Sequence, residues 1–200
     1  RELHHQLVDS GAKLLIVLEN FGAVAAEALP GTSVSQVVTT RVGDMLSWPK
    51  SLLVDMTLKY IRKMIPPFRI DGALRWKDAL ADGARLPRVE SVAGPDDTAQ
   101  LQYTGGTTGL SKGAVLPHRA PIANVASAEL CFGRLLDPQT DTVMICLPVY
   151  HIAAYSNLLF NMAHGFHTVL ITNPRDIPLL IAPILRGEAE IVVGARPIPE

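Results

Sequence analysis

The sequence has 200 residues, of which 48% are hydrophobic and 18% are charged. A chain of this length can bury roughly 70% of the surface that it exposes when unfolded, which is enough for one or two globular domains. The formal net charge of -1 and the isoelectric point near 6.7 argue against the strongly basic surface that recruits nucleic acid.

The cysteine content and the hydropathy pattern favour a cytoplasmic protein. Cys131 and Cys146 lie in apolar stretches and form neither a metal-binding pair nor a disulfide framework, which suits a reducing compartment. No apolar run reaches the roughly eighteen residues that a membrane span needs, and the first residues lack a secretory pattern. Because the sequence begins without Met inside a helical pattern, we expect a piece of a longer protein.

The first forty residues follow the β–α–β order of a parallel sheet. The pattern predicts a helix over 1–12 that stops at Gly11, a strand over 13–18, a helix over 20–30 and a strand over 33–40. His4 and His5, on the first helix, are expected to face solvent.

Residues 41–98 leave this order for an irregular or helical excursion. Residues 52–65 predict an amphipathic helix that ends at two prolines, with a further short helix over 75–81. One face of the first helix is apolar (Leu53, Met56, Tyr60, Ile61, Met64), and the other is charged (Asp55, Lys59, Arg62, Lys63). Such a helix either packs its apolar face on its own domain or lies on a membrane surface, and the pattern favours packing.

The alternation of strands and helices resumes after residue 98 and continues to the end of the chain. The pattern predicts strands around 99–103 and over 114–116, 142–147, 167–172 and 189–193, with helices over 120–136, 152–162 and 177–185. The continuous apolar run at 142–147 is typical of a central parallel strand. We expect an α/β fold with a mainly parallel sheet flanked by helices, in which ligands gather beyond the carboxyl ends of strands.

A glycine-rich segment, Tyr103–Gly113, is the strongest candidate for a ligand site. It contains four glycines, several hydroxyl side chains and Lys112, so it can direct many backbone and side-chain donors at one anion. A polyphosphate would use all of these donors, which points to ATP. The segment is not a Walker A loop, because Ser111 and Gly113 stand where that motif needs glycine before its lysine and a hydroxyl residue after it.

The segment from Thr104 to Gly113 resembles the signature loop of the adenylate-forming superfamily, which includes acyl-CoA synthetases, luciferases and peptide-synthetase adenylation domains. Its setting, from Leu101 to Ala114 and followed by Pro-His-Arg at 117–119, is most similar to bacterial long-chain fatty-acid CoA ligases. The resemblance implies that this loop binds the phosphates of ATP. The nucleotide-binding residues would be Thr104, Gly105, Gly106, Thr107, Thr108, Gly109, Ser111, Lys112 and Gly113.

Pro148-Val149-Tyr150-His151 resembles the second core motif of the same superfamily, in which an aromatic residue and a histidine follow a buried strand. A lone histidine at the start of a helix is more often a capping residue than a catalytic one. Next to the glycine-rich segment, however, His151 is expected near the reacting carboxylate and the α-phosphate, with Tyr150 packed beside it and Lys112 as the second catalytic residue. His164 and His167 form an H-x-x-H pattern without an evident third ligand, so no zinc site is assigned.

The resemblance implies that a fatty acid, ATP and coenzyme A become acyl-CoA, AMP and pyrophosphate through an acyl-adenylate. It covers nearly the whole chain as a part of the large amino-terminal domain, with 41–98 as the excursion and 99–200 as the core that carries the phosphate loop. The later family motifs, which hold Mg²⁺ and the adenylation lysine, are not in this sequence, and neither is the carboxy-terminal domain. We therefore expect this chain alone to form no acyl-adenylate.

Two alternatives stay open: an aryl or amino-acid adenylating enzyme of the same superfamily, and a nucleotide-binding module without catalysis. The chain departs from the fatty-acid subfamily at Ala120 and Ala153, where an asparagine and a bulkier residue are common, which leaves the acyl chain length open. Residues 193–197 also depart from the expected pattern. For the parent protein we expect a cytoplasmic location, with peripheral contact to the inner face of the membrane if the helix over 52–65 binds lipid.

Overall fold

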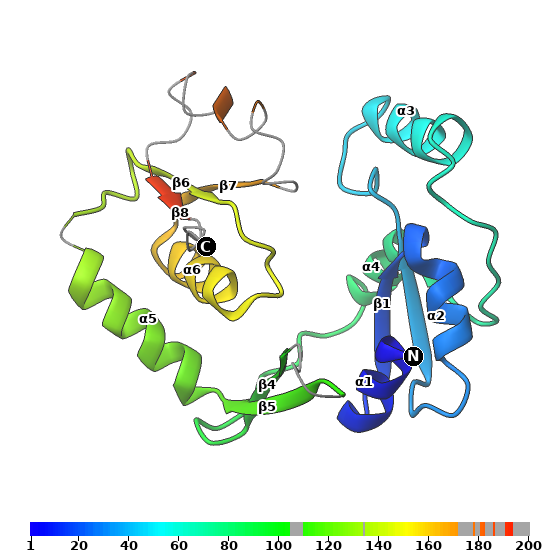
Figure 1. Cartoon of the computed structure of the whole chain (residues 1–200), viewed down its shortest axis with the longest axis horizontal. Helices are drawn as coiled ribbons and strands as arrows, with labels where there is room; N and C mark the ends of the chain where they lie inside the picture. Colours follow the sequence, from blue (N-terminus) through cyan, green and yellow to red (C-terminus); the bar gives the residue numbers. More distant parts are fainter. Residues whose placement is uncertain are drawn as a thin grey trace, which may run out of the picture. The chain divides into compact units, whose positions relative to one another are not determined.

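The computed structural model describes residues 1–104, 110–133, 135–171, 178, 181–182, 186 and 191–193. Contacts within the chain define two compact units. Residues 1–92 and 103–114 form the first unit, and residues 93–102 and 115–200 form the second. Figure 1 shows the helices and strands in chain order.

The first unit is built on a parallel sheet with the strand order β1-β2-β3. Its strands are β1 (Leu14–Leu18), β2 (Gln36–Thr40) and β3 (Leu74–Arg75). Val37 and Val38 of the central strand are buried, as the β-branched run predicted. The two-residue strand β3 was not predicted, because Leu74 and Arg75 carry no alternating pattern and become a strand only by pairing with Val38 and Thr39.

The helices of this unit lie close to the sequence positions at which they were predicted. The first unit contains α1 (Glu2–Ser10), a 3₁₀ turn (Glu19–Phe21), α2 (Gly22–Ala28) and α4 (Trp76–Gly83). Gly11 ends α1 with φ at 62°, a left-handed conformation that glycine adopts without strain. α2 packs on α1 and β1, and α4 packs on β2.

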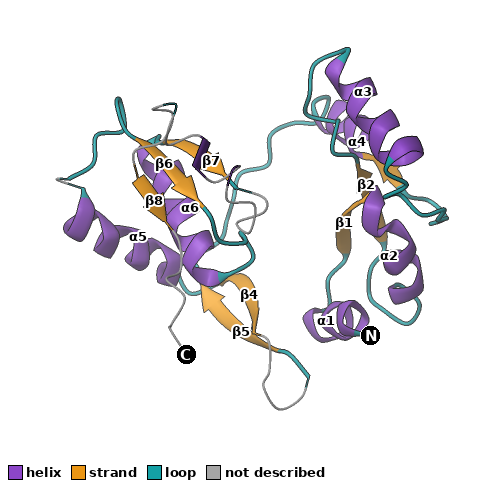
Figure 2. Ribbon diagram, turned by 45° about the horizontal axis from the view of Figure 1, so that its top comes forward, coloured by secondary structure: helices purple, strands orange, loops and turns teal. Residues whose placement is uncertain are grey.

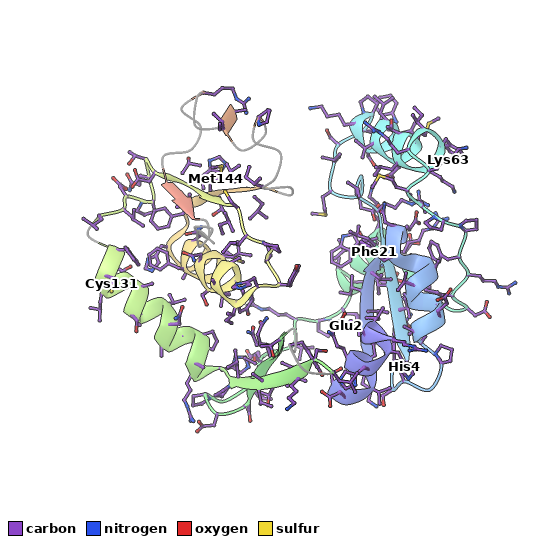
Figure 3. The ribbon with its side chains drawn as sticks, in the orientation of Figure 1. Glu2, His4, Phe21, Lys63, Cys131 and Met144 are labelled. Atoms are coloured by element: carbon purple, nitrogen blue, oxygen red, sulfur yellow. The ribbon has the colours of Figure 1, made fainter. Side chains whose placement is uncertain are left out.

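The segment predicted as one helix over 52–65 differs in both its course and its burial. It consists of α3 (Lys50–Met56) and a π-helical turn (Thr57–Ile61), in which the Arg62 amide donates to the Thr57 carbonyl at 2.8 Å. Among the described residues its apolar face is exposed, with Leu53 at 62% and Ile61 at 75% exposure. Lys63, labelled in Figure 3, follows the turn with φ at 50°.

The second unit contains a parallel sheet with the order β7-β6-β8. The strands are β6 (Thr142–Ile145), β7 (His167–Leu170) and β8 (Ile191–Val193). The central position of β6 is confirmed, and Met144, labelled in Figure 3, is completely buried. α6 (Ile152–His164) packs on β6 and β7, and α5 (Arg119–Phe132) packs on α6, as Figure 2 shows.

The remaining strands, β4 (Thr98–Thr104) and β5 (Lys112–Pro117), pair with each other in a separate two-stranded sheet. The α/β class with parallel sheets and flanking helices is therefore confirmed, but the strands in the described part of the chain divide over three sheets. Residues 178, 181 and 182 of the helix predicted over 177–185 are helical. None of the helices in the described ranges combines the length and the hydrophobicity needed to span a bilayer.

Candidate functional site

The glycine-rich segment follows β4 and leads into β5. Gly105, Gly106, Thr107, Thr108 and Gly109 lie outside the described residues, whereas both ends of the segment are described. The side chains of Thr104 and Lys112 are exposed, so both can donate to a ligand in solution. Gly113 is half-buried at the start of β5.

Ser111, which the sequence predicted as a nucleotide-binding residue, is buried. It is only 8% exposed, and its hydroxyl oxygen lies 3.5 Å from the side-chain amide of Gln6. Its carbonyl oxygen lies 2.9 Å from Nε2 of His5. Because a carbonyl can only accept, Nε2 of His5 carries the proton in this contact. Ser111 therefore contacts α1 through both its carbonyl and its hydroxyl group. Donation of its hydroxyl hydrogen to a nucleotide stays a prediction.

The prediction that His4 and His5 face solvent is wrong. Both side chains are half-buried, and His4 Nδ1 lies 2.9 Å from the carbonyl oxygen of Ala28, while His5 reaches Ser111. Their partners lie 24 and 106 residues away along the chain. Helical periodicity alone could not reveal contacts over such separations.

Tyr103 connects the other end of the segment to the same helix. Its hydroxyl group donates a hydrogen bond to the Asp9 carboxylate at 2.6 Å. This bond to an anion, helped by burial, raises the pKa of Tyr103 above its ordinary value. The aromatic ring also packs on Gly113, where an added Cβ would lie 3.0 Å from the ring. Both ends of the glycine-rich segment therefore meet at one aromatic ring.

The turn before α6 carries the second pair of predicted site residues. His151 is the N-cap of α6, and its Nδ1 accepts a hydrogen bond from the Ala153 amide at 3.2 Å. The carbonyl oxygen of Tyr150 accepts a hydrogen bond from the Gln102 side chain at 2.7 Å. The Tyr150 side chain is 81% exposed, so the expected packing beside His151 is not found.

The capping contact determines which nitrogen of His151 can donate. In a neutral imidazole one ring nitrogen accepts and the other carries the proton. Because Nδ1 accepts from Ala153, the neutral ring carries its proton on Nε2. The exposed side chain can therefore offer one N–H donor to an anionic oxygen while it caps the helix. The structure shows the capping role, and the position near a reacting carboxylate stays a prediction.

An apolar cavity of about 610 Å³ begins directly after this histidine. We call it the α5–α6 cavity, because both helices contribute to its walls together with Val143 of β6. Its lining includes Asn124, Ala128, Cys131, Phe132, Ile152, Ala153 and Phe160. The cavity has the size and the largely hydrophobic lining of small-molecule sites. Cys131 is exposed and lines this cavity, whereas Cys146 is buried, which raises its pKa.

The other histidines of the second unit make contacts of their own. His164 Nε2 lies 3.0 Å from the Glu129 carboxylate and stands beside the rings of Phe160 and Phe166. His167 contacts the Thr142 hydroxyl group at 3.2 Å. Within the described ranges no group of three or more His, Cys, Asp or Glu side chains could hold a metal ion.

The predicted site residues divide between the two units. Thr104, Ser111, Lys112 and Gly113 belong to the first unit, and the turn of Tyr150 and His151 belongs to the second. That the loop and the turn face one crevice stays a prediction.

Four residues that contact the predicted site were not predicted from the sequence. They are Gln102 and three residues of α1 that reach the loop: His5, Gln6 and Asp9. The i, i+4 spacing of His5 and Asp9 placed them on one helical face, but it did not name their partners.

Comparison with known proteins identifies the family. The family model described as AMP-binding enzyme matches residues 1–195. The chain is 40% identical over 197 residues to a long-chain-fatty-acid CoA ligase of Escherichia coli O157:H7, and 42% identical to one of Salmonella typhimurium. Each match covers 98% of this chain and 35% of the relative.

The fold also matches solved structures. A long-chain-fatty-acid CoA ligase of Archaeoglobus fulgidus superposes with a TM-score of 0.57 at 23% identity, covering 95% of this chain and 31% of the other. At that identity the likeness concerns the fold alone. The chain spans about a third of the length of the curated relatives that it matches. The family model, in contrast, covers almost every residue of this chain, and the chain therefore belongs to the family of AMP-binding enzymes.

Proposed function

We propose that the protein carrying this chain is an AMP-forming ligase that joins a long-chain fatty acid to coenzyme A. The observation that carries the proposal is the apolar α5–α6 cavity, which begins at Ile152 and Ala153, immediately after His151. A fatty acid needs a polar site for its carboxylate beside an apolar site for its chain. The names of the relatives, long-chain-fatty-acid CoA ligases, support the same substrate class.

In the first proposed step a fatty-acid carboxylate oxygen forms a bond to the α-phosphorus of ATP, and the bond from that phosphorus to pyrophosphate breaks. The attack brings two anions together and adds charge to the departing pyrophosphate, so preorganised donors lower the barrier. Thr104 to Gly109 and Lys112 would supply these donors. In the second step the thiol sulfur of coenzyme A forms a bond to the acyl carbon, the bond from that carbon to the AMP oxygen breaks, and the thiol proton is released to water. Within the described residues no group of three or more His, Cys, Asp or Glu side chains could hold a metal ion, and the residues that would hold Mg²⁺ are expected in the later family motifs.

His151 would act in this scheme as a donor rather than as a base. Its Nδ1 is engaged by the Ala153 amide, so the proton on Nε2 is the one directed at a ligand. An N–H at that position would stabilise negative charge on the carboxylate or on the α-phosphate as the new bond forms. The exposed Tyr150 side chain is available to contact the adenylate.

The α5–α6 cavity would take the hydrocarbon chain. Each methylene group transferred from water into such an environment contributes about 0.8 kcal/mol. A long chain would therefore bind more tightly than a short one until it reaches the end of the cavity. Ala153, which follows His151 by two positions, adds only a methyl group to the lining of the cavity.

The test uses the full-length protein and measures fatty-acid-dependent exchange between ATP and pyrophosphate. Palmitate should support exchange, whereas benzoate and a mixture of amino acids should not. Exchange with an aryl or amino acid alone would instead favour the corresponding adenylating enzyme. ATP binding without exchange for any acid would favour a nucleotide-binding module.

Cys131 provides a second measurement, because its exposed thiol lines the α5–α6 cavity. Palmitate should slow alkylation of Cys131 by a small maleimide, and butyrate at the same concentration should not. Cys146 is an internal control, since it is buried and does not line the cavity. Equal labelling of Cys131 with and without palmitate would exclude the cavity as the acyl site.

We also propose that residues 50–64 contact an anionic lipid surface. The apolar face of this segment is exposed among the described residues, and three exposed basic side chains lie in the same segment: Lys59, Arg62 and Lys63. Hydrophobic side chains next to basic ones are what an interfacial helix presents to lipid. Because a long-chain fatty acid partitions into membranes, contact with the lipid surface would bring the enzyme close to its substrate.

Liposome co-sedimentation of the full-length protein tests this contact. Binding to vesicles with phosphatidylserine should fall when Lys59, Arg62 and Lys63 are changed to Glu. A control protein with Arg69, Arg85 and Arg88 changed to Glu carries the same net charge and should sediment like the wild type. Unchanged binding of the first variant would end the proposal, and absent binding of the wild type would indicate that other parts of the protein cover this face.

A further inference from the structure

Helix α1 contacts both ends of the glycine-rich segment through side chains. At the entry Tyr103 donates to Asp9 at 2.6 Å, and at the exit His5 reaches the Ser111 carbonyl at 2.9 Å. A third and longer contact, 3.5 Å, joins Gln6 to the Ser111 hydroxyl. His5, Gln6, Asp9, Tyr103 and Ser111 all belong to the first unit. One helix of nine residues therefore fixes two points of the chain that lie eight positions apart.

These contacts restrain both the backbone at Ser111 and the side chain of Tyr103. The His5 contact ends on a backbone carbonyl, so it limits the path of the chain at Ser111 directly. Ser111 is also buried, which removes competition from water. The Tyr103 hydroxyl donates to a charged acceptor, and such bonds are shorter and stronger than neutral ones. Gly113 lies against the hydroxyl end of the same ring, where an added Cβ would lie 3.0 Å from Cζ.

We propose that α1 is the positioning element of the phosphate loop, in which His5 and Asp9 hold the two ends of the loop at the spacing that ATP binding requires. The proposal rests on the proposed function of the loop. Glycine-rich chain loses much conformational freedom when it is ordered around a ligand. Fixing both ends beforehand removes part of that cost from binding, which is the physical meaning of preorganisation. His5 and Asp9 would thus be positioning residues that never touch the nucleotide.

The side-chain chemistry supplies conservative replacements. A glutamine in place of His5 keeps an N–H donor that can reach a carbonyl, whereas alanine removes it. Phenylalanine in place of Tyr103 keeps the ring on Gly113 and removes only the bond to Asp9. His4 offers a matched control, because it is the neighbouring histidine of the same helix and contacts a different carbonyl, that of Ala28, at the same distance of 2.9 Å.

The first experiment measures ATP–pyrophosphate exchange and ATP binding by calorimetry in the full-length protein. His5→Ala and Tyr103→Phe should each raise the Kd and the KM for ATP about tenfold, the size expected when one hydrogen bond is lost. The KM for the fatty acid should not change. His5→Gln should recover most of the ATP affinity, and His4→Ala should bind ATP like the wild type.

The second experiment needs neither ATP nor activity. Amide hydrogen exchange of a peptide covering residues 103–113 should become faster in His5→Ala than in the wild type, and stay unchanged in His4→Ala. Equal exchange in both alanine variants, or ATP affinities that fall equally, would overturn the positioning role. If the wild-type protein binds no ATP but the two alanine variants still differ in hydrogen exchange as expected, the proposed function is refuted. The contacts by which α1 holds the two ends of the loop would still stand.

Discussion

The side-chain amide of Gln102 donates a hydrogen bond of 2.7 Å to the backbone carbonyl of Tyr150. The donor stands on β4, the strand that continues into the glycine-rich segment, and the acceptor precedes His151. The bond therefore joins β4 to the turn before α6, and both of its residues belong to the second unit.

Removing this bond should impair the reaction more than the fold. In the full-length enzyme Gln102→Ala should lower the rate of ATP–pyrophosphate exchange about tenfold, because a lost hydrogen bond of about 1.4 kcal/mol corresponds to one decade. The melting temperature should change little, since the Gln102 contact is partly open to water. Gln139→Ala, at an exposed position of the same unit, is the control and should retain the wild-type rate. Equal rates for both variants would show that the Tyr150 turn does not depend on Gln102.

His151 can be tested for its two roles separately. Asparagine is among the best N-cap residues, so His151→Asn should keep the stability of α6, whereas His151→Ala should lose about 1 kcal/mol. If His151 also donates to the reacting groups, both variants should lose activity, by about a hundredfold or more. Denaturant unfolding and exchange kinetics of the two full-length variants give the comparison. An active asparagine variant would reduce the role of His151 to capping.

Lys112 supplies the cation of the loop and is exposed, so its removal should affect the ligand and not the core. Lys112→Ala should slow ATP–pyrophosphate exchange by about a hundredfold, the typical effect of removing one preorganised donor. Lys13→Ala, an exposed lysine before β1, is the matched control. An unchanged rate in Lys112→Ala would remove this lysine from the mechanism.

The Tyr103–Asp9 bond predicts a loss of stability at alkaline pH. The bond to the carboxylate raises the pKa of Tyr103 in the folded protein, so the protonated phenol is favoured by folding. Its contribution is fully present below the ordinary tyrosine pKa of about 10 and disappears as the pH rises through the higher folded-state value. The free energy of unfolding of Tyr103→Phe should therefore fall less steeply above that pH than in the wild type. Tyr60→Phe, which removes an exposed phenol, should follow the wild-type curve.

The sequence predicted the elements whose own residues determine them. The β-branched run of β2, the apolar run of β6 and the glycine at the end of α1 carry enough local information to fix type and position. The π-helical turn after Met56 could not be predicted, because it depends on backbone bonds such as that from Arg62 to Thr57. β3 likewise exists only through its partner strand.

The candidate site follows the same division. Lys112 and His151 were named from their motifs, because a motif states the residue type that the chemistry requires, and their roles toward a nucleotide stay predictions. Gln102, His5 and Asp9 could not be named in this way, because their role comes from partners that are 48, 106 and 94 residues away. Helical and strand periodicity describe which face a residue occupies, and they contain no information on what that face meets.

The ring of Tyr103 fills the space beside Gly113, so these two positions are not free to vary independently. A methyl group at 113 would push the ring, and a smaller side chain at 103 would leave a gap and an unpaired carboxylate at Asp9. Homologues that enlarge residue 113 should therefore show a compensating reduction at 103. Paired substitution at these two positions would be the evolutionary signature of their contact.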